Sequence, residues 1–75
     1  MIINNLKEKF ECNKKVKFKL FSLEYIIEIE DNKVCVYPIL YPTRKKEYFS
    51  LEDALNNYTI YNDNIIENSN FIILI

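Results

Sequence analysis

The stretch of sequence that decides the fold is residues 15–30, KVKFKLFSLEYIIEIE. Its first half has apolar residues at even positions, between lysines, and its second half has them at odd positions, mostly between glutamates. A β-strand points alternate side chains to opposite faces, so one unbroken strand cannot bury both sets on one side. The chain is therefore predicted to turn near residues 21–23 and to form two adjacent antiparallel strands.

A two-residue hairpin turn is predicted at residues 31–32, Asp-Asn, because both residue types tolerate positive φ. This turn pairs Ile29 with Val34 on one face of the sheet and Glu28 with Cys35 on the other. One face then carries apolar residues and the other carries charges, and a slip of one residue would destroy both patterns. A third strand is therefore expected to follow the turn.

The connection between the first two strands is predicted to be a four-residue loop centred on residues 22–23, since Ser-Leu is a poor two-residue turn. In this register Lys17 lies opposite Glu28, and Lys15 lies opposite Glu30. Opposite charges paired across strands contribute about 0.2–1 kcal/mol each. The glutamates are then expected to cancel most of the positive field of the lysines.

The remaining elements follow from shorter patterns. Apolar residues at helical spacing predict a helix over residues 3–11, with Asn13 as its left-handed cap. Pro38 is expected to end the third strand because proline cannot donate to a strand ladder. Ser50, followed by acids, is typical of a helix N-cap. The other expected segments are a fourth strand at 47–49, a helix at 51–56, an extended segment at 58–61, a turn at 62–64 and a buried C-terminal strand at 71–75.

The predicted fold is α+β: an N-terminal helix, a three- to four-stranded antiparallel meander, a short capped helix and a C-terminal strand, with both helices on the apolar face of the sheet. Seventy-five residues suffice for one small domain, so residues 1–75 are expected to form a single unit. The chain has no glycine, so positions that need positive φ are expected to fall to asparagine or aspartate. Its many Asn, Ile, Lys and Tyr residues indicate an AT-rich genome, such as that of a bacterium, a phage or a mobile element.

The composition argues against several classes of function. There is no histidine, so the commonest general base is missing. The lack of glycine excludes a glycine-rich phosphate loop. Cys12 and Cys35 alone cannot complete a four-ligand zinc site, and both are expected to be free and buried. We therefore expect no enzyme activity, no catalytic residues, no cofactor and no metal.

The charge and hydropathy of the chain bear on its location. No apolar run approaches the roughly 20 residues that span a bilayer, and the first residues lack the pattern of a signal peptide. A cytoplasmic protein with no membrane partner is expected. The formal net charge is −1, but all ten basic residues lie at or before Lys46. Residues 47–75 therefore contain five acidic residues and no basic residue.

The most promising binding segment runs from Tyr37 to Lys46. Its first part, YPILYP at residues 37–42, is apolar and is stiffened by two prolines. A preorganised loop loses less entropy on binding, and tyrosine and arginine are common hot-spot residues. The predicted binding residues are Tyr37, Ile39, Leu40, Tyr41, Arg44, Lys45 and Lys46. These features predict a small non-enzymatic protein–protein interaction module of the inhibitor, immunity or adaptor type; the alternative for Ile39 and Leu40 is that they close one end of the core.

Two other functions fit the sequence. The basic segments Lys14–Lys19 and Arg44–Lys46, with tyrosines near the second, have the charge and aromatic character that holds single-stranded nucleic acid. The apolar segment 71–75 would, as an exposed edge, pair with a partner or with a second copy to give a homodimer. Nucleic-acid binding and structural self-association are therefore the alternatives to protein binding.

Overall fold

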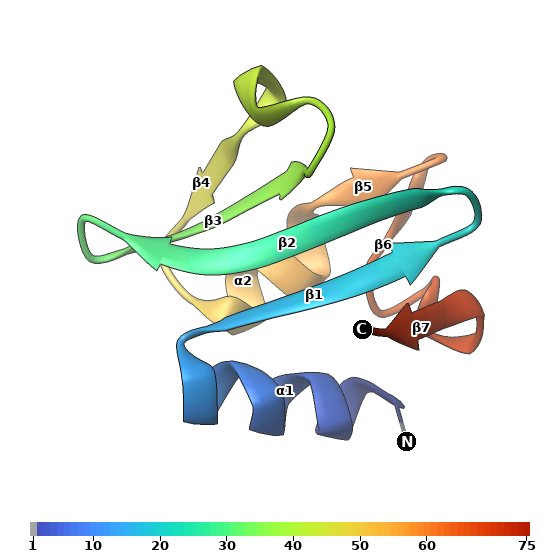
Figure 1. Ribbon diagram of the computed structural model, residues 1–75, viewed down its shortest axis with the longest axis horizontal. Coiled ribbons are helices and arrows are strands. Elements are labelled where there is room, and N and C mark those ends of the chain that lie inside the picture. Colours follow the sequence, from blue (N-terminus) through green and yellow to red (C-terminus); the bar gives the residue numbers. More distant parts are fainter. Residues whose placement is uncertain (1) are drawn as a thin grey trace.

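A five-stranded antiparallel sheet is the frame of the protein in the computed structural model, which describes residues 2–75 (Figure 1). The strand order is β4-β3-β2-β1-β7, and β5 and β6 form a separate pair. The elements in chain order are α1 (Ile2–Asn13), β1 (Lys15–Leu20), β2 (Leu23–Glu30), β3 (Lys33–Pro38), the 3₁₀ helix η1 (Pro42–Arg44), β4 (Lys46–Tyr48), α2 (Leu51–Asn57), β5 (Thr59–Ile60), β6 (Asp63–Asn64), the 3₁₀ helix η2 (Ser69–Phe71) and β7 (Ile72–Leu74). This is the α+β fold expected from the sequence. Within residues 2–75, the helices are too short or too polar to cross a membrane.

The hairpin between β2 and β3 has the predicted turn and register. Asp31 and Asn32 have φ values of 53° and 65°, and Ile29 pairs with Val34. β3 ends at Pro38, as expected for a residue that cannot donate to the ladder. Short polar side chains tolerate the left-handed conformation, so the local sequence is sufficient to specify this hairpin.

The hairpin between β1 and β2 differs from the prediction by two residues. The turn consists of Phe21 and Ser22 alone, and Phe21 has a φ of 56°. Lys15 therefore pairs with Glu28 rather than with Glu30. A shift of two residues keeps every side chain on its predicted face, so the alternation is confirmed and the predicted partners are wrong. The reason is that a phenylalanine occupies a left-handed position, which residue preferences do not predict.

Two further turns use residues other than those predicted. α1 runs through Asn13, and Lys14 takes the left-handed conformation instead, at a φ of 60°. The N–H of Lys14 donates to the carbonyl of Phe10 at 2.7 Å, which closes the last turn of the helix. The turn predicted at 62–64 lies at residues 61–62, where both φ values are positive. Because the chain has no glycine, lysine and tyrosine as well as asparagine adopt the left-handed conformation at these turns.

The C-terminal segment is an edge strand, which corrects the prediction of a buried internal strand. β7 pairs with β1 and stands last in the strand order. Ile72 is buried, whereas Phe71, Ile73 and Ile75 are more than half exposed. A continuous apolar run is typical of a strand buried on both faces, but here only one face packs against the core.

The short helix α2 begins as predicted, and the strand before it is present. The side chain of Ser50 accepts a hydrogen bond from the N–H of Asp53 at 3.0 Å, so it is the N-cap. Ala54 and Leu55 are buried on the side of the helix that faces the sheet. The predicted fourth strand is β4, which begins one residue earlier than expected.

The two faces of the sheet differ in what covers them. Both helices pack on the inner face, where Leu6 of α1, Phe18 of β1 and Leu55 of α2 are fully buried in one core cluster. α2 lies behind the sheet in Figure 1, so the viewer looks at the outer face, and no helix of residues 2–75 is drawn in front of it. Ile26 and Cys35 are buried on this outer face but lie outside the core cluster.

Candidate functional site

The β3–β4 loop, residues 39–45, contains most of the predicted binding residues and has a well-defined backbone. The N–H of Ile39 donates to the carbonyl of Glu24 on β2 at 2.9 Å, which extends the strand pairing one residue beyond β3. The N–H of Tyr41 donates to the carbonyl of Pro38 at 2.9 Å, which closes a tight turn. The start of the loop is therefore held by the sheet and by its own backbone.

Side chains fasten both flanks of the loop to glutamates of β2. The hydroxyl of Tyr37 donates to a carboxylate oxygen of Glu28 at 2.8 Å, and this hydrogen bond raises the pKa of the tyrosine. The Nζ atom of Lys45 donates to Glu30 at 2.7 Å, and this bond raises the pKa of the lysine. Lys45 Nζ also lies 5.4 Å from the centre of the Tyr37 ring, so the two flanks touch each other.

The tip of the loop presents an apolar side chain beside an aromatic ring and a cation. Leu40 is 73% exposed and Tyr41 is 43% exposed. The Cζ atom of Arg44 lies 4.6 Å from the centre of the Tyr41 ring, and the N–H of Arg44 donates to the Tyr41 carbonyl at 3.0 Å. This loop tip, defined as these three residues, offers hydrophobic, aromatic and cationic contacts to a binding partner.

The seven predicted binding residues lie together at this end of the sheet, but they have different roles. Three form the loop tip, and Tyr37 and Lys45 fasten its flanks. Lys46 is exposed at the start of β4. Ile39 is partly buried, and neither it nor Leu40 belongs to the core cluster, so they do not close the end of the core. The prolines indicate the loop, whereas the sequence contains no signal for its attachment to β2.

A hollow of about 170 Å³ adjoins the loop tip. It is lined by Ser22 and Glu24 on one side and by Ile39 and Leu40 on the other. The β1–β2 turn therefore forms one wall of the surface around Leu40.

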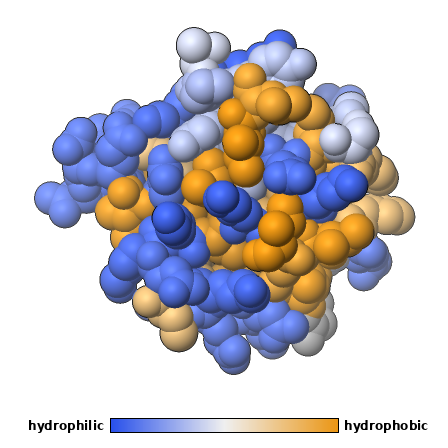
Figure 2. All heavy atoms as spheres, in the orientation of Figure 1, coloured by the Kyte–Doolittle hydropathy of each residue, from blue (hydrophilic) through white to orange (hydrophobic). Residues whose placement is uncertain are grey.

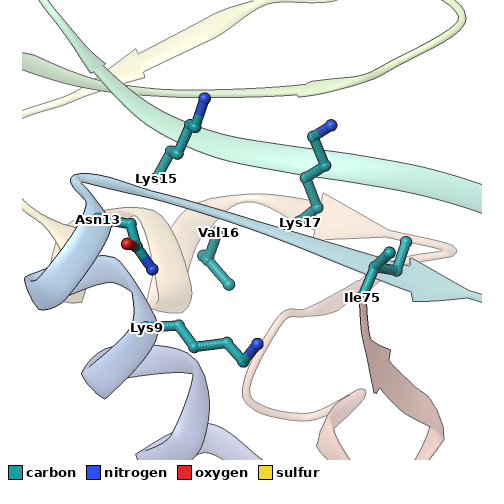
Figure 3. A pocket seen from close by; sticks show the side chains of 6 residues that line it. All are labelled: Lys9, Asn13, Lys15, Val16, Lys17 and Ile75. Carbon is teal, nitrogen blue, oxygen red and sulfur yellow. The ribbon is translucent and has the colours of Figure 1, made fainter.

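A second hollow, of about 290 Å³, lies between α1 and β1 and is lined by three lysines (Figure 3). Figure 3 shows Lys15 and Lys17 on the side of β1 opposite to Val16, while Lys9 of α1 extends toward Ile75. The three ammonium groups do not converge on one point, which argues against an anion-binding cradle.

The lysines of β1 are not neutralised in the way the sequence predicts. Among residues 2–75 they form no ion pair within 4.0 Å. The nearby glutamates have other partners, since Glu28 accepts from Tyr37 and Glu30 accepts from Lys45. The two basic segments also do not form one surface, because β2 and β3 separate β1 from β4.

No sequence pattern indicates the exposed aromatic cluster at the β1–β2 turn. The ring centre of Phe21 lies 5.6 Å from that of Tyr61 and 5.5 Å from that of Phe71, and all three side chains are more than half exposed. Phe21 and Tyr61 both have positive φ. These residues come from three distant parts of the chain, so no local pattern brings them together. The one hint in the sequence is that it has no glycine, so other residues must take the positive-φ positions at turns.

The two free cysteines differ in their surroundings. Cys12 is exposed, which corrects the expectation that both are buried, and Cys35 is buried on the outer face. Burial raises the pKa of the Cys35 thiol, and the nearby carboxylates of Glu30 and Glu47 raise it further. A raised thiol pKa opposes nucleophilic chemistry. Within residues 2–75, no three His, Cys, Asp or Glu side chains are grouped so as to hold a metal ion.

Comparison with known proteins returns no match: no family model, no curated protein and no solved structure is significantly similar to this chain. A function for the chain therefore rests on its own geometry.

Proposed function

We propose that this protein is a small non-enzymatic module that binds another protein through the loop tip. The observation that carries the proposal is Leu40, which is 73% exposed on a loop that is fastened on both flanks. In this position Leu40 contributes nothing to the core cluster. Burial of a leucine side chain in a partner is worth about 1.5–3 kcal/mol.

The neighbours of Leu40 indicate the chemistry of the partner. Tyr41 supplies a partly exposed ring and Arg44 supplies a guanidinium group above it. These are residue types that dominate binding hot spots. A complementary surface has an apolar pocket for Leu40 and a carboxylate within reach of Arg44. Because the loop is already ordered, binding costs less conformational entropy, which suits an inhibitor, immunity or adaptor protein.

The proposal is tested by site-specific photo-crosslinking in the cells that make the protein. A photoreactive phenylalanine analogue replaces Leu40, and a matched analogue replaces Glu8, an exposed residue of α1, which lies far from the loop in Figure 1. One discrete protein adduct is expected from position 40 and none from position 8. Arg44→Glu is expected to reduce that adduct by about tenfold. No discrete adduct at position 40, or equal adducts from both positions, would rule out the proposal.

Nucleic-acid binding is examined by a separate titration. Labelled single- and double-stranded oligonucleotides are mixed with the protein at low and at moderate salt. Phosphate contacts strengthen as salt falls, so a protein-binding module is expected to show no binding even at low salt. Tight, salt-dependent binding that Lys17→Glu abolishes would favour the nucleic-acid alternative instead.

A further inference from the structure

The outer face of the sheet is a broad surface, and none of the helices in residues 2–75 lies in front of it. Figure 2 shows this face in the orientation of Figure 1, and hydrophobic residues are interleaved there with hydrophilic ones. Ile26 and Cys35 are buried on it outside the core cluster, while Ile73 and Ile75 are more than half exposed. Exposed apolar residues gathered on one face are typical of a surface that packs against another molecule.

Strand pairing arranges the outer face in transverse rows. One row reads Ile73, Lys19, Glu24 and Ile39 across β7, β1, β2 and the end of β3. Lys19 pairs with both Ile73 and Glu24, and the Glu24 carbonyl accepts the N–H of Ile39. The row is apolar at both ends, and its two central charges have opposite sign.

The next row but one repeats this order of charge. Lys15 pairs with Glu28, so the basic residue is again on β1 and the acidic residue on β2. The row between them consists of Ile75, Lys17, Ile26 and Tyr37. The outer face thus has three lysines along β1 and, along β2, two glutamates separated by the buried Ile26, with apolar or aromatic residues on either side.

We infer that the outer face binds a second copy of this chain in a symmetric, face-to-face dimer. A two-fold axis parallel to the strands, midway between β1 and β2, places β1 of each copy over β2 of the other. Lys19 then faces Glu24 of the second copy, and Ile73 faces Ile39 of the second copy. The symmetry repeats each contact, and a two-fold interface requires such a self-complementary surface. Face-to-face sheets lie about 10 Å apart, a gap that lysine and glutamate side chains span together.

The charges needed for this interface are not used within one copy. Among residues 2–75, neither the three lysines of β1 nor Glu24 forms an ion pair within 4.0 Å. Toward β4, by contrast, the charges are already paired: Lys45 with Glu30 and Lys33 with Glu47. Beside the proposed axis, Lys19 and Glu24 each face their complement on the second copy, and Lys15 faces Glu28, whereas Lys17 faces Ile26.

The outer face is large enough for this contact. A standard interface covers about 800 Å² on each partner, which is about a sixth of the 4902 Å² surface of this chain. The face spans the two long dimensions of the molecule, 30 and 26 Å. The dimer uses charges of β1 and β2 and none of the three residues of the loop tip, although Ile39, which it places opposite Ile73 of the second copy, is adjacent to Leu40 in the chain and lines the same hollow.

The test is sedimentation analysis of the full chain over a range of concentrations, at low and at high salt. The wild-type chain is expected to dimerise, and less tightly at high salt, because the contacts are partly ionic. Lys19→Glu and Glu24→Lys are each expected to weaken dimerisation by about tenfold or more, because each places like charges opposite each other twice. The double variant K19E/E24K is expected to restore the dimer. Glu8→Lys is the matched control for Glu24→Lys, since it makes the same change of charge at an exposed site on α1.

Several outcomes would overturn the inference. A chain that stays monomeric at every concentration has no such interface. A dimer that both single variants leave intact uses another surface, such as the free edge of β7. If the double variant is folded by circular dichroism but does not dimerise, Lys19 does not pair with Glu24 of the second copy. If Glu8→Lys weakens the dimer as much as Glu24→Lys does, the effect comes from net charge and not from the proposed contact.

Discussion

The Nζ atom of Lys45 lies 2.7 Å from a carboxylate oxygen of Glu30, and this contact attaches the end of the β3–β4 loop to β2. Both groups are exposed, so the pair adds little to the free energy of unfolding. Its effect is local, because it restrains the segment that carries Leu40. Loop order and global stability are therefore expected to respond differently when it is removed.

Lys45→Met, which keeps the aliphatic stem and removes the charge, is expected to speed amide hydrogen exchange in the loop by about tenfold. The thermal midpoint is expected to stay nearly unchanged. Lys46→Met is the matched control, because the side chain of Lys46 is exposed and forms no hydrogen bond or ion pair among residues 2–75. Equal exchange in the two variants would show that the Lys45–Glu30 pair does not order the loop.

Lys14→Gly is expected to stabilise the protein, because Lys14 has a φ of 60° at the end of α1. The left-handed conformation costs a residue with a Cβ about 1–2 kcal/mol, and the greater freedom of glycine in the unfolded chain offsets part of the gain. A net increase of roughly 0.5–1 kcal/mol in the free energy of unfolding is expected from denaturant titration. Lys14→Ala keeps the Cβ and is expected to give no increase; an equal gain from alanine would contradict the explanation.

Stability is expected to fall at alkaline pH through Tyr58. Burial raises its pKa to about 12, and the neighbouring Tyr25 and Tyr48 add to the shift. The ordinary tyrosine pKa is about 10, so the folded state holds this proton more tightly than the unfolded state. The resulting stability is fully present below pH ~10 and is lost as the pH rises toward ~12.

Denaturant unfolding of wild type and Tyr58→Phe at pH ~8 and pH ~11 measures this effect, and the wild type is expected to lose on the order of 1 kcal/mol more than the variant. The other tyrosines and the lysines titrate in both proteins, so their contribution cancels in the comparison. Equal losses in the two proteins would mean that Tyr58 is not the group responsible.

The two thiols are expected to react at very different rates with a disulfide reagent at mildly alkaline pH. Cys12 is exposed, whereas Cys35 is fully buried and its pKa is raised by burial. One thiol per chain is expected to react quickly and the second only after denaturant is added. Cys12→Ser is expected to abolish the fast phase, and a fast phase that persists in this variant would show that Cys35 is accessible.

Local residue types account for the parts of the fold that the sequence predicts well. The Asp31-Asn32 turn and the Ser50 cap each depend on side chains within a few residues of the feature they form. The β1–β2 turn is different, because Phe21 contacts Tyr61 and Phe71. Aromatic pairs contribute about 0.5–1.5 kcal/mol each, which is comparable to the cost of about 1–2 kcal/mol for the left-handed conformation. That compensation comes from distant residues, so a local pattern cannot reveal it.

In the candidate site, too, some features follow from local residues and others depend on contacts between distant residues. The prolines and tyrosines are enough to locate a stiff loop near Leu40, because their effect on the backbone is local. Its attachment depends on Glu28 and Glu30, which reach the loop only because β2 pairs with β3. The aromatic cluster and the edge position of β7 likewise require the packing of the whole chain.

By itself, the sequence determined which side chains share a face of the sheet, because alternation along a strand is a property of neighbouring residues. It also determined the turn at residues 31–32, the start of the helix that Ser50 caps and the position of the loop. Only the tertiary structure decided how the charges are used. Near the loop, Tyr37 donates a hydrogen bond to Glu28 and Lys45 pairs with Glu30. Lys19 and Glu24 form no ion pair within residues 2–75. The physical reason is that an ion pair depends on which strands become neighbours and on their exact register, and here both depend on contacts between residues far apart in the chain.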